Sequence, residues 1–525
     1  MTTDAVLLAK IETLTKTVEQ QGGALKTAHL TIDKLNLELS YLKRMRYGRA
    51  SEKLDHEGQL ELMSAALMPV AAANDPAQSK VTDIEVGRRS RKAKGRSVQR
   101  ELPDHLPRNI VMHPPAGGCS CAACGVALRE IGQDISEVLE YEPGNFHVTR
   151  HVRPKLACTG CRTIRQAGAP SRPIERGLAG AGLLAHVLVS KYADHLPLYR
   201  QSQMYAREGV MLERSTLADW VAGSARLLTP LARAIGDYVL RAVKVHSDDT
   251  PTRVLGAGKG KAHLGRLWVY VRDDRASADS SPAAVWFQYS VNRKGEHPGA
   301  HLANYKGILQ VDAFAGYNAL FGDGRIIEAA CLAHARRKYF DIHQHEHRAP
   351  GTLAHQALQR IARIYAVEAD IRGQPPDERC RQRQARTRPL LQEMHDWLND
   401  TLGLLSAKSS MALAIGYSLN NWRALNRFVE DGRIEADNNI AERALRAVAI
   451  GRKNYLHFGS DAGGHSAAVI YTLLGTAKLN EIDPQAYLRY VLERIADHPI
   501  CRIDELLPWA VADKLRGAPA LLRAA

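Results

Sequence analysis

The fold predicted from the sequence rests on two stretches: AVKVHSDD at residues 242–249 and GILQVD at residues 307–312. Each consists mainly of apolar and β-branched residues up to an aspartate, a pattern that indicates a buried strand with a carboxylate at its end. Carboxylates at the ends of neighbouring strands of one sheet lie close together. We therefore expect Asp248 and Asp312 to belong to a single site.

The elements around these two strands follow a characteristic order. Two further strands are expected between them, at 266–272 and 283–291, and a short helix leads into the second stretch. A fifth strand at 326–330 is followed by a helix that begins with CLAHARRKYF. Three strands, a helix, a strand with a terminal aspartate, a strand and a helix make the order of a ribonuclease H-like α/β domain.

A third acid, Glu442, follows much later in the chain. It lies about one turn into a helix for which Asp437 is placed as the N-cap. Because 64 residues separate Asp248 from Asp312 and 130 separate Asp312 from Glu442, we expect a helical insertion before the last acid. The expected parts are a core at 241–342 and 433–480, an insertion at 343–432 and a helical tail at 481–525.

Three carboxylates on such a scaffold suit a two-metal site. Mg²⁺, or Mn²⁺ in its place, is a hard ion that takes oxygen ligands, and two such ions can bridge one phosphate. Asp248 and its neighbour Asp249 should face opposite sides of their strand, so only one of them can reach the metals. Read singly, an acid of this kind is more often a helix cap or a surface residue.

Other residues near the three acids have two interpretations each. His334 either orients a phosphate or a carboxylate, or is a hydrogen-bonded structural histidine. Arg446 lies four residues after Glu442 and either binds DNA or pairs with that acid. The basic residues in these motifs that are candidates for holding DNA phosphates are Arg336, Arg443, Arg446, Arg452 and Lys453.

The N-terminal region, residues 1–54, is predicted to form a coiled coil. Apolar residues recur from Leu7 to Leu42 at alternating steps of four and three over five heptads. An apolar seam of this kind needs a partner helix. That partner is either a second copy of the chain or the same chain folded back at Gly22-Gly23.

A basic segment lies in the expected linker at 55–105. The chain carries 71 Lys and Arg against 56 Asp and Glu, a net charge of +15, and residues 88–100 (RRSRKAKGRSVQR) alone supply seven of the positive charges. The segment is either a solvated, disordered arm or an arm that lies along DNA phosphates, and the two are compatible. Its predicted DNA-binding residues are Arg88, Arg89, Arg91, Lys92, Lys94 and Arg96.

Two CxxC pairs have the spacing of a structural zinc site. The predicted ligands are Cys121, Cys124, Cys158 and Cys161. Alternating sequence between the pairs suggests short strands, so we expect a zinc ribbon over 106–172 in which the ion holds the fold together and performs no chemistry. Cys119 is an alternative ligand to Cys121, and unpaired thiols are the alternative to a metal site. The other three cysteines are expected to be ordinary buried residues: Cys331, Cys380 and Cys501.

The region 173–240 contains a candidate helix-turn-helix. One helix is expected at 199–208, Gly209 supplies a turn residue, and Ser215 is placed as the N-cap of a second helix. Many helix pairs of this kind merely pack against each other, so DNA recognition and packing are equally good interpretations.

Length and composition narrow the class of protein. A chain of 525 residues is long enough for about three domains. Neither a secretory signal nor a stretch long enough to span a bilayer is recognisable, and eight cysteines are too few for a disulfide scaffold. We therefore expect a cytoplasmic protein without a membrane partner, for which the positive charge favours a polyanion.

Taken together, these motifs resemble those of the DDE transposases of the insertion sequence sixty-six family. The resemblance rests on SDDTPTRVL, LQVDAFAGYNAL, CLAHARRKYFD, DNNIAERALR, GRKNYLHFGSDAGG, KYADHLPLYRQSQMYAREGV, YLKRMRYGRASEKL and the double CxxC. It covers nearly the whole chain, and the motifs stand in the family's order. The resemblance implies that Asp248, Asp312 and Glu442 are the catalytic triad. The family's first motif usually reads Asp-Glu-Thr, and Asp249 stands here in the place of the glutamate.

The resemblance also implies an activity and partners. Such an enzyme binds the terminal inverted repeats of its element, hydrolyses the phosphodiester at each end and joins the freed 3′-hydroxyl to target DNA. It acts as a multimer and travels with small accessory proteins of the same element. Two alternatives remain at this stage: a non-catalytic or decayed DNA-binding regulator, and a nuclease or resolvase on the same scaffold.

Overall fold

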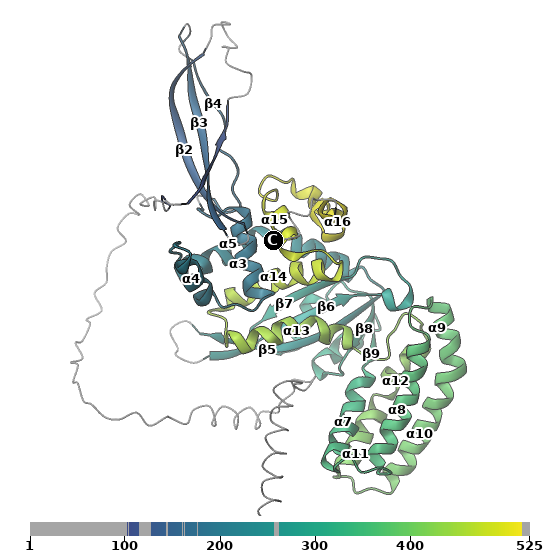
Figure 1. Ribbon diagram of the computed structural model, residues 1–525. Coiled ribbons are helices and arrows are strands. Elements are labelled where there is room, and N and C mark those ends of the chain that lie inside the picture. Colours follow the sequence, from purple (N-terminus) through teal and green to yellow (C-terminus); the bar gives the residue numbers. More distant parts are fainter. Residues whose placement is uncertain are drawn as a thin grey trace, which may run out of the picture. The chain divides into compact units, whose positions relative to one another are not determined.

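The structure is a computed structural model, shown in Figure 1. It describes residues 106–114, 128–142, 145–159, 163–175, 177–256 and 262–516, together with residues 102, 104 and 161. The predicted coiled coil, the basic arm and three of the cysteines (Cys119, Cys121 and Cys124) lie outside these residues. The described part is a mixed α/β structure that contains two separate sheets.

Five strands form a mixed sheet in the order β7-β6-β5-β8-β9. Their bounds are β5 Lys244–Leu255, β6 Ala262–Arg272, β7 Ala284–Ser290, β8 Gly307–Val311 and β9 Ile326–Ala330. β6 is antiparallel to both β5 and β7, whereas β8 runs parallel to both β5 and β9. All five strands lie where the sequence predicts strands.

β5 is longer than the sequence predicts, because it does not end at the two aspartates. Only Lys244–His246 pairs with β8, whereas the pairing with β6 continues to Leu255. The far end of β5 has a second partner, since the Phe458 amide donates a hydrogen bond to the Arg253 carbonyl at 2.8 Å. The expected strand end was therefore wrong, because part of what extends β5 comes from a distant segment of the chain.

Three long helices pack on this sheet (Figure 1). They are α5 (Arg214–Leu240), α13 (Asn439–Asn454) and α14 (Asp461–Leu479). α13 packs along β5 and β6, while α5 and α14 pack against β7. The hydroxyls of Thr472 and Thr476 on α14 accept hydrogen bonds from the Phe287 and Val285 amides at 2.9 and 3.2 Å. The free edge of β7 is thus covered and is closed to pairing with another chain.

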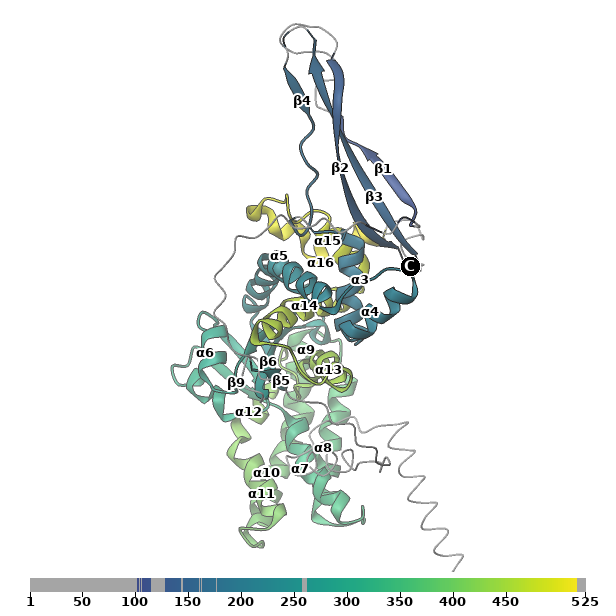
Figure 2. The same cartoon turned by 90° about the vertical axis from the view of Figure 1, so that its left-hand side faces the viewer.

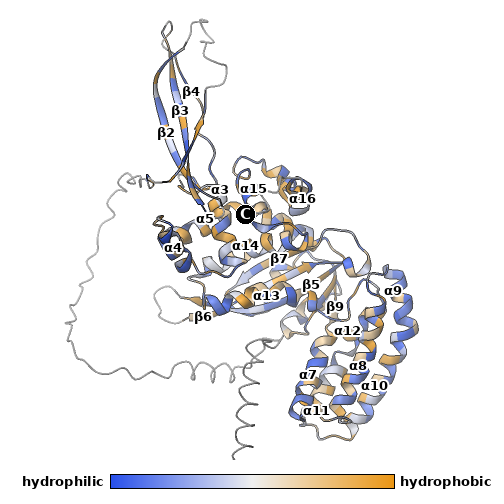
Figure 3. Cartoon of the chain, viewed as in Figure 1, coloured by the Kyte–Doolittle hydropathy of each residue, from blue (hydrophilic) through white to orange (hydrophobic). Residues whose placement is uncertain are grey.

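Helices fill the chain between β9 and α13, where the sequence predicts helices. They are α7 (Leu332–His345), α8 (Leu353–Asp370), α9 (Pro376–Gln382), α10 (Arg388–Gly403), α11 (Ser410–Asn420) and α12 (Trp422–Asn426), with a π-helical turn η3 (Arg383–Thr387) before α10. Hydrophobic and hydrophilic residues alternate along these helices in Figure 3. On α8 the buried residues Ala357, Ile361 and Ile364 recur every three or four positions. This spacing gives each helix an apolar side, and together these sides form a core of their own.

A second sheet contains four strands, visible from two directions in Figures 1 and 2. They are β1 (Arg108–Met112), β2 (Leu128–Glu142), β3 (Asn145–Cys158) and β4 (Ile164–Gln166). β2 and β3 form an antiparallel hairpin, β1 runs parallel to β3, and β4 pairs antiparallel with the end of β3. The sequence predicts short strands here, but β2 and β3 are 15 and 14 residues long.

The candidate helix-turn-helix region contains α3 (Ala181–Tyr192), α4 (Leu198–Arg207) and the start of α5. Gly209 has a φ of 81°, as suits a turn residue between α4 and α5. The prediction that Ser215 caps the second helix was wrong. α5 begins at Arg214, and the Ser215 hydroxyl donates a hydrogen bond to the Glu213 carboxylate at 3.3 Å.

The C-terminal part of the described chain is helical, as the sequence predicts. It contains α15 (Pro484–Leu492), the 3₁₀ segment η5 (Ile500–Leu506) and α16 (Pro508–Arg516). Among the residues that the structure describes, none of the helices combines the length and the apolar character that crossing a membrane requires.

Candidate functional site

The first two predicted acids lie at matching positions on neighbouring strands. β5 and β8 are parallel, and His246 stands opposite Gln310 in their register. Asp248 lies two residues after His246, and Asp312 lies two residues after Gln310. Because side chains alternate along a strand, Asp248 faces the same side as His246, and Asp312 the same side as Gln310. Asp248 remains within β5, and Asp312 comes directly after β8.

Hydrogen bonds bring the start of α13 to the same side of the sheet. The His246 ring contacts the Asn438 side-chain oxygen at 3.0 Å, and the Asn438 amide group donates to the Ser247 carbonyl at 2.8 Å. Gln310 donates to the carbonyl oxygens of Glu435 and Asp437 at 2.5 and 3.1 Å. The segment that leads into α13 is therefore fixed across the ends of β5 and β8.

Glu442 lies in the first turn of α13, next to this contact. The helix begins at Asn439, with Asn438 in the N-cap position, so the prediction of Asp437 as the N-cap was wrong by one residue. Asp437 instead accepts a hydrogen bond from the Asn439 amide at 3.1 Å. Among the described residues, the cluster of ligand atoms that contains Glu442 joins it to Cys331 and His334 and includes neither Asp248 nor Asp312.

The backbone around Asp312 is held tightly. Its carboxylate accepts a hydrogen bond from the Phe314 amide at 3.1 Å, and its carbonyl accepts one from the Tyr417 hydroxyl at 3.2 Å. Ala313 between them has a φ of 62°, a left-handed conformation that costs a residue with a side chain about 1 kcal/mol or more. The Asp312 side chain is only 10% exposed.

His334 lies beside Glu442, with 3.6 Å between its Nε2 and a carboxylate oxygen of Glu442. The Cys331 thiol is part of the same cluster, because ligand atoms of the three residues lie within 4.8 Å of one another. The thiol accepts a hydrogen bond from the Asn438 amide at 3.1 Å, and burial raises its pKa to about 12. Cys331 is therefore a buried packing residue, and His334 lies next to the Glu442 carboxylate.

Asp249 faces the other side of β5. Ser247, two residues earlier, contacts the Tyr317 hydroxyl at 3.0 Å on that side. The Asp249 carboxylate is 1% exposed and forms ion pairs with Arg266 and Arg293, both at 2.9 Å. The Arg293 guanidinium also lies 4.0 Å from Asp312. Neither arginine was predicted from the sequence. For Arg293 a signal was present, because this arginine follows an expected strand by two residues.

The predicted DNA-binding residues of this region lie mostly on the surface. The exposed ones are Arg336, Arg443, Arg446 and Lys453. Three of these are on α13, at spacings that place them along one side of the helix after Glu442. Arg452 is partly buried and donates to the Pro251 carbonyl at 2.5 Å. Glu442 lies within ion-pair distance of His334.

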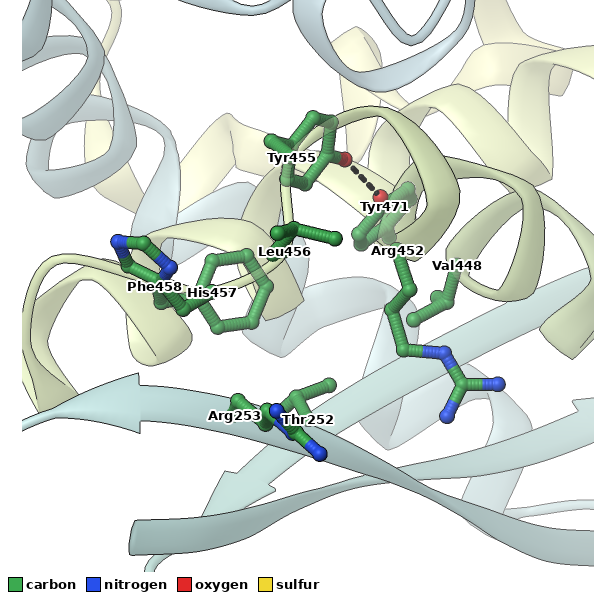
Figure 4. A pocket seen from close by; sticks show the side chains of 9 residues that line it. All are labelled: Thr252, Arg253, Val448, Arg452, Tyr455, Leu456, His457, Phe458 and Tyr471. Carbon is green, nitrogen blue, oxygen red and sulfur yellow. Dashed lines mark hydrogen bonds between the residues drawn. The ribbon is translucent and has the colours of Figure 1, made fainter. Parts of the chain in front are cut away.

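Arg452 also lines a pocket between the far half of β5 and the end of α13 (Figure 4). Thr252 and Arg253 lie on the β5 side, and Tyr455 and Tyr471 join through their hydroxyls at 2.7 Å. Sequence reasoning did not foresee this pocket, because its two walls are about 200 residues apart in the chain.

The second CxxC pair lies at the end of the β2–β3 hairpin. Cys158 is the last residue of β3 and is buried, whereas Cys161 is exposed. The Cys161 amide donates to the Cys158 sulfur at 3.4 Å, as in a tight turn that presents two sulfurs together. Leu128, four residues after Cys124, pairs with Cys158, so the chain enters β2 at the same end of the hairpin. Cys158 and Cys161 are thus two of the four predicted ligands, and the other two, Cys121 and Cys124, lie outside the described residues.

Two of the three single cysteines differ from the prediction of ordinary buried residues. Cys331 is buried, but Cys380 is partly exposed and Cys501 is exposed.

These features define a class: a mixed α/β protein with aspartates next to its parallel strand pair β5–β8 and a separate cysteine-bearing hairpin. Comparison with known families agrees. The model described as "Transposase IS66 family" matches residues 176–466, and that of the "IS66 C-terminal element" matches 472–509. The "zinc-finger binding domain of transposase IS66" matches 119–162, which spans both CxxC pairs, and "Transposase C of IS166 homeodomain" matches 34–111. The chain belongs to the IS66 transposase family.

Relatives in Sinorhizobium fredii are similar over nearly their full length. The chain is 38% identical to the uncharacterized protein y4hP, over 91% of this chain and 88% of that protein. It is 36% identical to the uncharacterized protein y4jD, over 90% of this chain and 94% of that protein. Membership of the family indicates a nucleic-acid-processing enzyme that binds DNA and uses zinc and a divalent metal.

Proposed function

We propose that the protein is a DDE transposase that cuts and joins the ends of an insertion sequence, with Asp248, Asp312 and Glu442 as its catalytic triad. The observation that carries this proposal is that Asp248 and Asp312 each lie two residues beyond the last paired positions of β5 and β8, His246 and Gln310, where hydrogen bonds also fix the start of α13. The strand order β7-β6-β5-β8-β9 supports a ribonuclease H-like core.

The three acids fit a site for two Mg²⁺ or Mn²⁺ ions, because all three offer the oxygen donors that hard cations prefer. When bound, such ions activate the attacking oxygen and stabilise the leaving 3′ oxygen of a phosphodiester. The chain's own contribution is to orient the ligands. His334 holds Glu442, and the Phe314 amide holds Asp312.

The basic residues after Glu442 would hold the DNA that enters this site. Arg443, Arg446 and Lys453 lie on the surface of the helix that carries the third acid. Phosphate contacts fix the register of DNA on a protein without reading its sequence. Recognition of the terminal repeats would then come from the basic arm, the zinc ribbon and the helix-turn-helix region.

The other parts of the proposal follow the family layout. The coiled coil would bring copies of the chain together, since two DNA ends must meet in one complex, and accessory proteins of the element would assist. The cytoplasm is the proposed location. The boundaries of the parts remain those predicted from the sequence.

Strand transfer in vitro tests the function. The purified full-length protein is incubated with Mg²⁺, a plasmid target and labelled DNA that carries the ends of its own element. We expect 3′-end cleavage and labelled products joined to the plasmid. Cleavage without joining would instead indicate a nuclease or resolvase, and tight binding without either reaction would indicate a regulator. Both outcomes contradict the proposal.

Metal analysis tests the zinc site separately. We expect about one zinc per chain, lost in Cys124→Ser and in Cys158→Ser, because a structural site needs all four thiolates. Cys380→Ser and Cys501→Ser serve as controls and should keep their zinc. A zinc content that none of these substitutions changes would rule out the assigned ligands.

A further inference from the structure

Arg293 occupies an unusual position beside the proposed triad. It follows β7, in the segment before α6 (Glu296–His301), and its guanidinium reaches Asp249 and approaches Asp312. Its Nε and Nη2 atoms both lie 2.9 Å from the same Asp249 oxygen. The ring of Phe314 packs under the guanidinium, 3.7 Å from its carbon. Three contacts therefore fix the orientation of this side chain.

The Asp249 carboxylate pairs with two arginines. It is almost fully buried, and each of its two oxygens is paired with a different arginine, Arg266 or Arg293. A buried carboxylate is stable when its charge is paired in this way. Because side chains alternate along a strand, it faces the side of β5 opposite to Asp248. These contacts indicate that Asp249 holds the arginine side chains in place.

The free face of Arg293 points to a ligand that carries negative charge. Its side chain remains 37% exposed, and none of the described residues accepts a hydrogen bond from its Nη1 atom. The distance of 4.0 Å to Asp312 is too long for a hydrogen bond. A guanidinium with two donors left over, held rigidly at the edge of a nuclease-type site, matches the geometry of a phosphate oxygen.

We propose that Arg293 contacts the DNA phosphate beside the triad, and that Asp249 is a positioning residue that holds Arg293 and does not bind the catalytic metals. The inference rests on the proposed function, because it places the phosphate at the site formed by Asp248, Asp312 and Glu442. It explains why this chain can carry aspartate at position 249: a carboxylate is needed there for its charge.

DNA binding without metal tests the role of Arg293. The probe is a short labelled DNA duplex, and its dissociation constant is measured in EDTA over a series of salt concentrations for the full-length protein. In Arg293→Gln we expect weaker binding and a slope of log K against log salt that is smaller by about 0.9, the value for one lost phosphate contact. An unchanged affinity and slope in Arg293→Gln would overturn the proposal.

Matched variants test the role of Asp249. Asp249→Asn should weaken binding as Arg293→Gln does, and the double variant should be no weaker than either, because the two residues act as one unit. Asp249→Glu keeps the charge and should restore binding, which also guards against a folding defect in Asp249→Asn. The control is Asp273→Asn, which removes another arginine-paired, largely buried carboxylate at a different place in the sheet. It should bind like the wild type.

Metal binding separates this proposal from the proposed function. We expect Mn²⁺ to raise the melting temperature of the wild type, of Asp249→Asn and of Arg293→Gln by equal amounts, and to lose this effect in Asp312→Asn. Loss of the Mn²⁺ effect in Asp249→Asn but not in Arg293→Gln would make Asp249 a metal ligand and overturn the inference. Retention in Asp312→Asn would overturn the proposed triad, and the binding measurements would still decide the role of Arg293.

Discussion

Two hydrophobic cores share strand β8, and they are built differently. The sheet core contains the inner faces of β5 to β8 together with α5, α13 and α14, and its buried polar groups are mostly uncharged, such as Thr472 and Asn438. The insertion core, formed by α7 to α12, encloses charged side chains. The sheet core therefore shapes the candidate site, while the insertion core fixes the segment that leads from the insertion back into α13.

Two arginines are the charged side chains that the insertion core encloses. Arg379 and Arg383 are almost fully buried and pair with Glu435 at 2.9 Å and with Glu368 at 2.6 Å, respectively. They also donate to carbonyl oxygens of the chain that returns from the insertion: Arg383 to Phe428 and Arg379 to Gly432, both at 2.7 Å. That segment continues directly into α13, so the arginines act on the path that delivers Glu442.

The largest effect is expected on the sheet side, from Asp312→Ala. Removal of one of three carboxylates should reduce cleavage and strand transfer by more than about 1,000-fold, equivalent to about 4 kcal/mol in the barrier. DNA binding and the melting temperature should stay close to those of the wild type. The control is Asp323→Ala, an exposed aspartate on the connection between β8 and β9. Wild-type activity in Asp312→Ala would remove the basis for the site.

The next largest effect is expected on the insertion side, from Arg383→Leu. The substitution leaves Glu368 buried with a weaker partner, and we expect a loss of about 3 kcal/mol in stability. Hydrogen exchange of α8 and α10, together with a urea unfolding curve, measures it. Arg381→Ala, two residues away on an exposed pair, should leave both unchanged. Equal losses of stability in Arg383→Leu and Arg381→Ala would show that the buried ion pair of the insertion core contributes no more than an exposed one.

The smallest effect is expected at the contact between the two cores, from Tyr417→Phe. The Tyr417 hydroxyl, on α11, donates to the Asp312 carbonyl, so its removal costs about 1 kcal/mol of local order. We expect the rate of cleavage to fall by about 3- to 10-fold at unchanged DNA affinity. Tyr490→Phe, on α15, is the control. An unchanged rate would show that the insertion does not hold Asp312.

The sequence predicted those features that depend on local pattern. Apolar runs placed the strands around Asp248 and Asp312, and the 130-residue gap before Glu442 indicated the helices of the insertion. The extension of β5 was missed because two aspartates interrupt its apolar pattern, whereas the pairing with β6 continues through them to Leu255. Arg293 was missed for a different reason: the residues that give it meaning, Asp249 and Phe314, are close to it only after folding.

Short-range preferences also competed with one another at helix starts. Ser215 and Asp437 are both residue types that favour the N-cap, yet the helices begin one residue before Ser215 and two after Asp437. In the second case tertiary contacts decide the outcome. Asn438 takes the cap position because its side chain is already bonded to His246 and Ser247 on β5.

The separation of Glu442 from the other two acids also has a consequence for synthesis. The ribosome must add 130 residues after Asp312 before Glu442 exists, which at roughly 5–20 residues per second takes about 6 to 26 seconds. During this interval the nascent chain already contains every residue of the cysteine-bearing hairpin but lacks one carboxylate of the proposed triad. The proposed triad is therefore completed only after the whole hairpin has been synthesised.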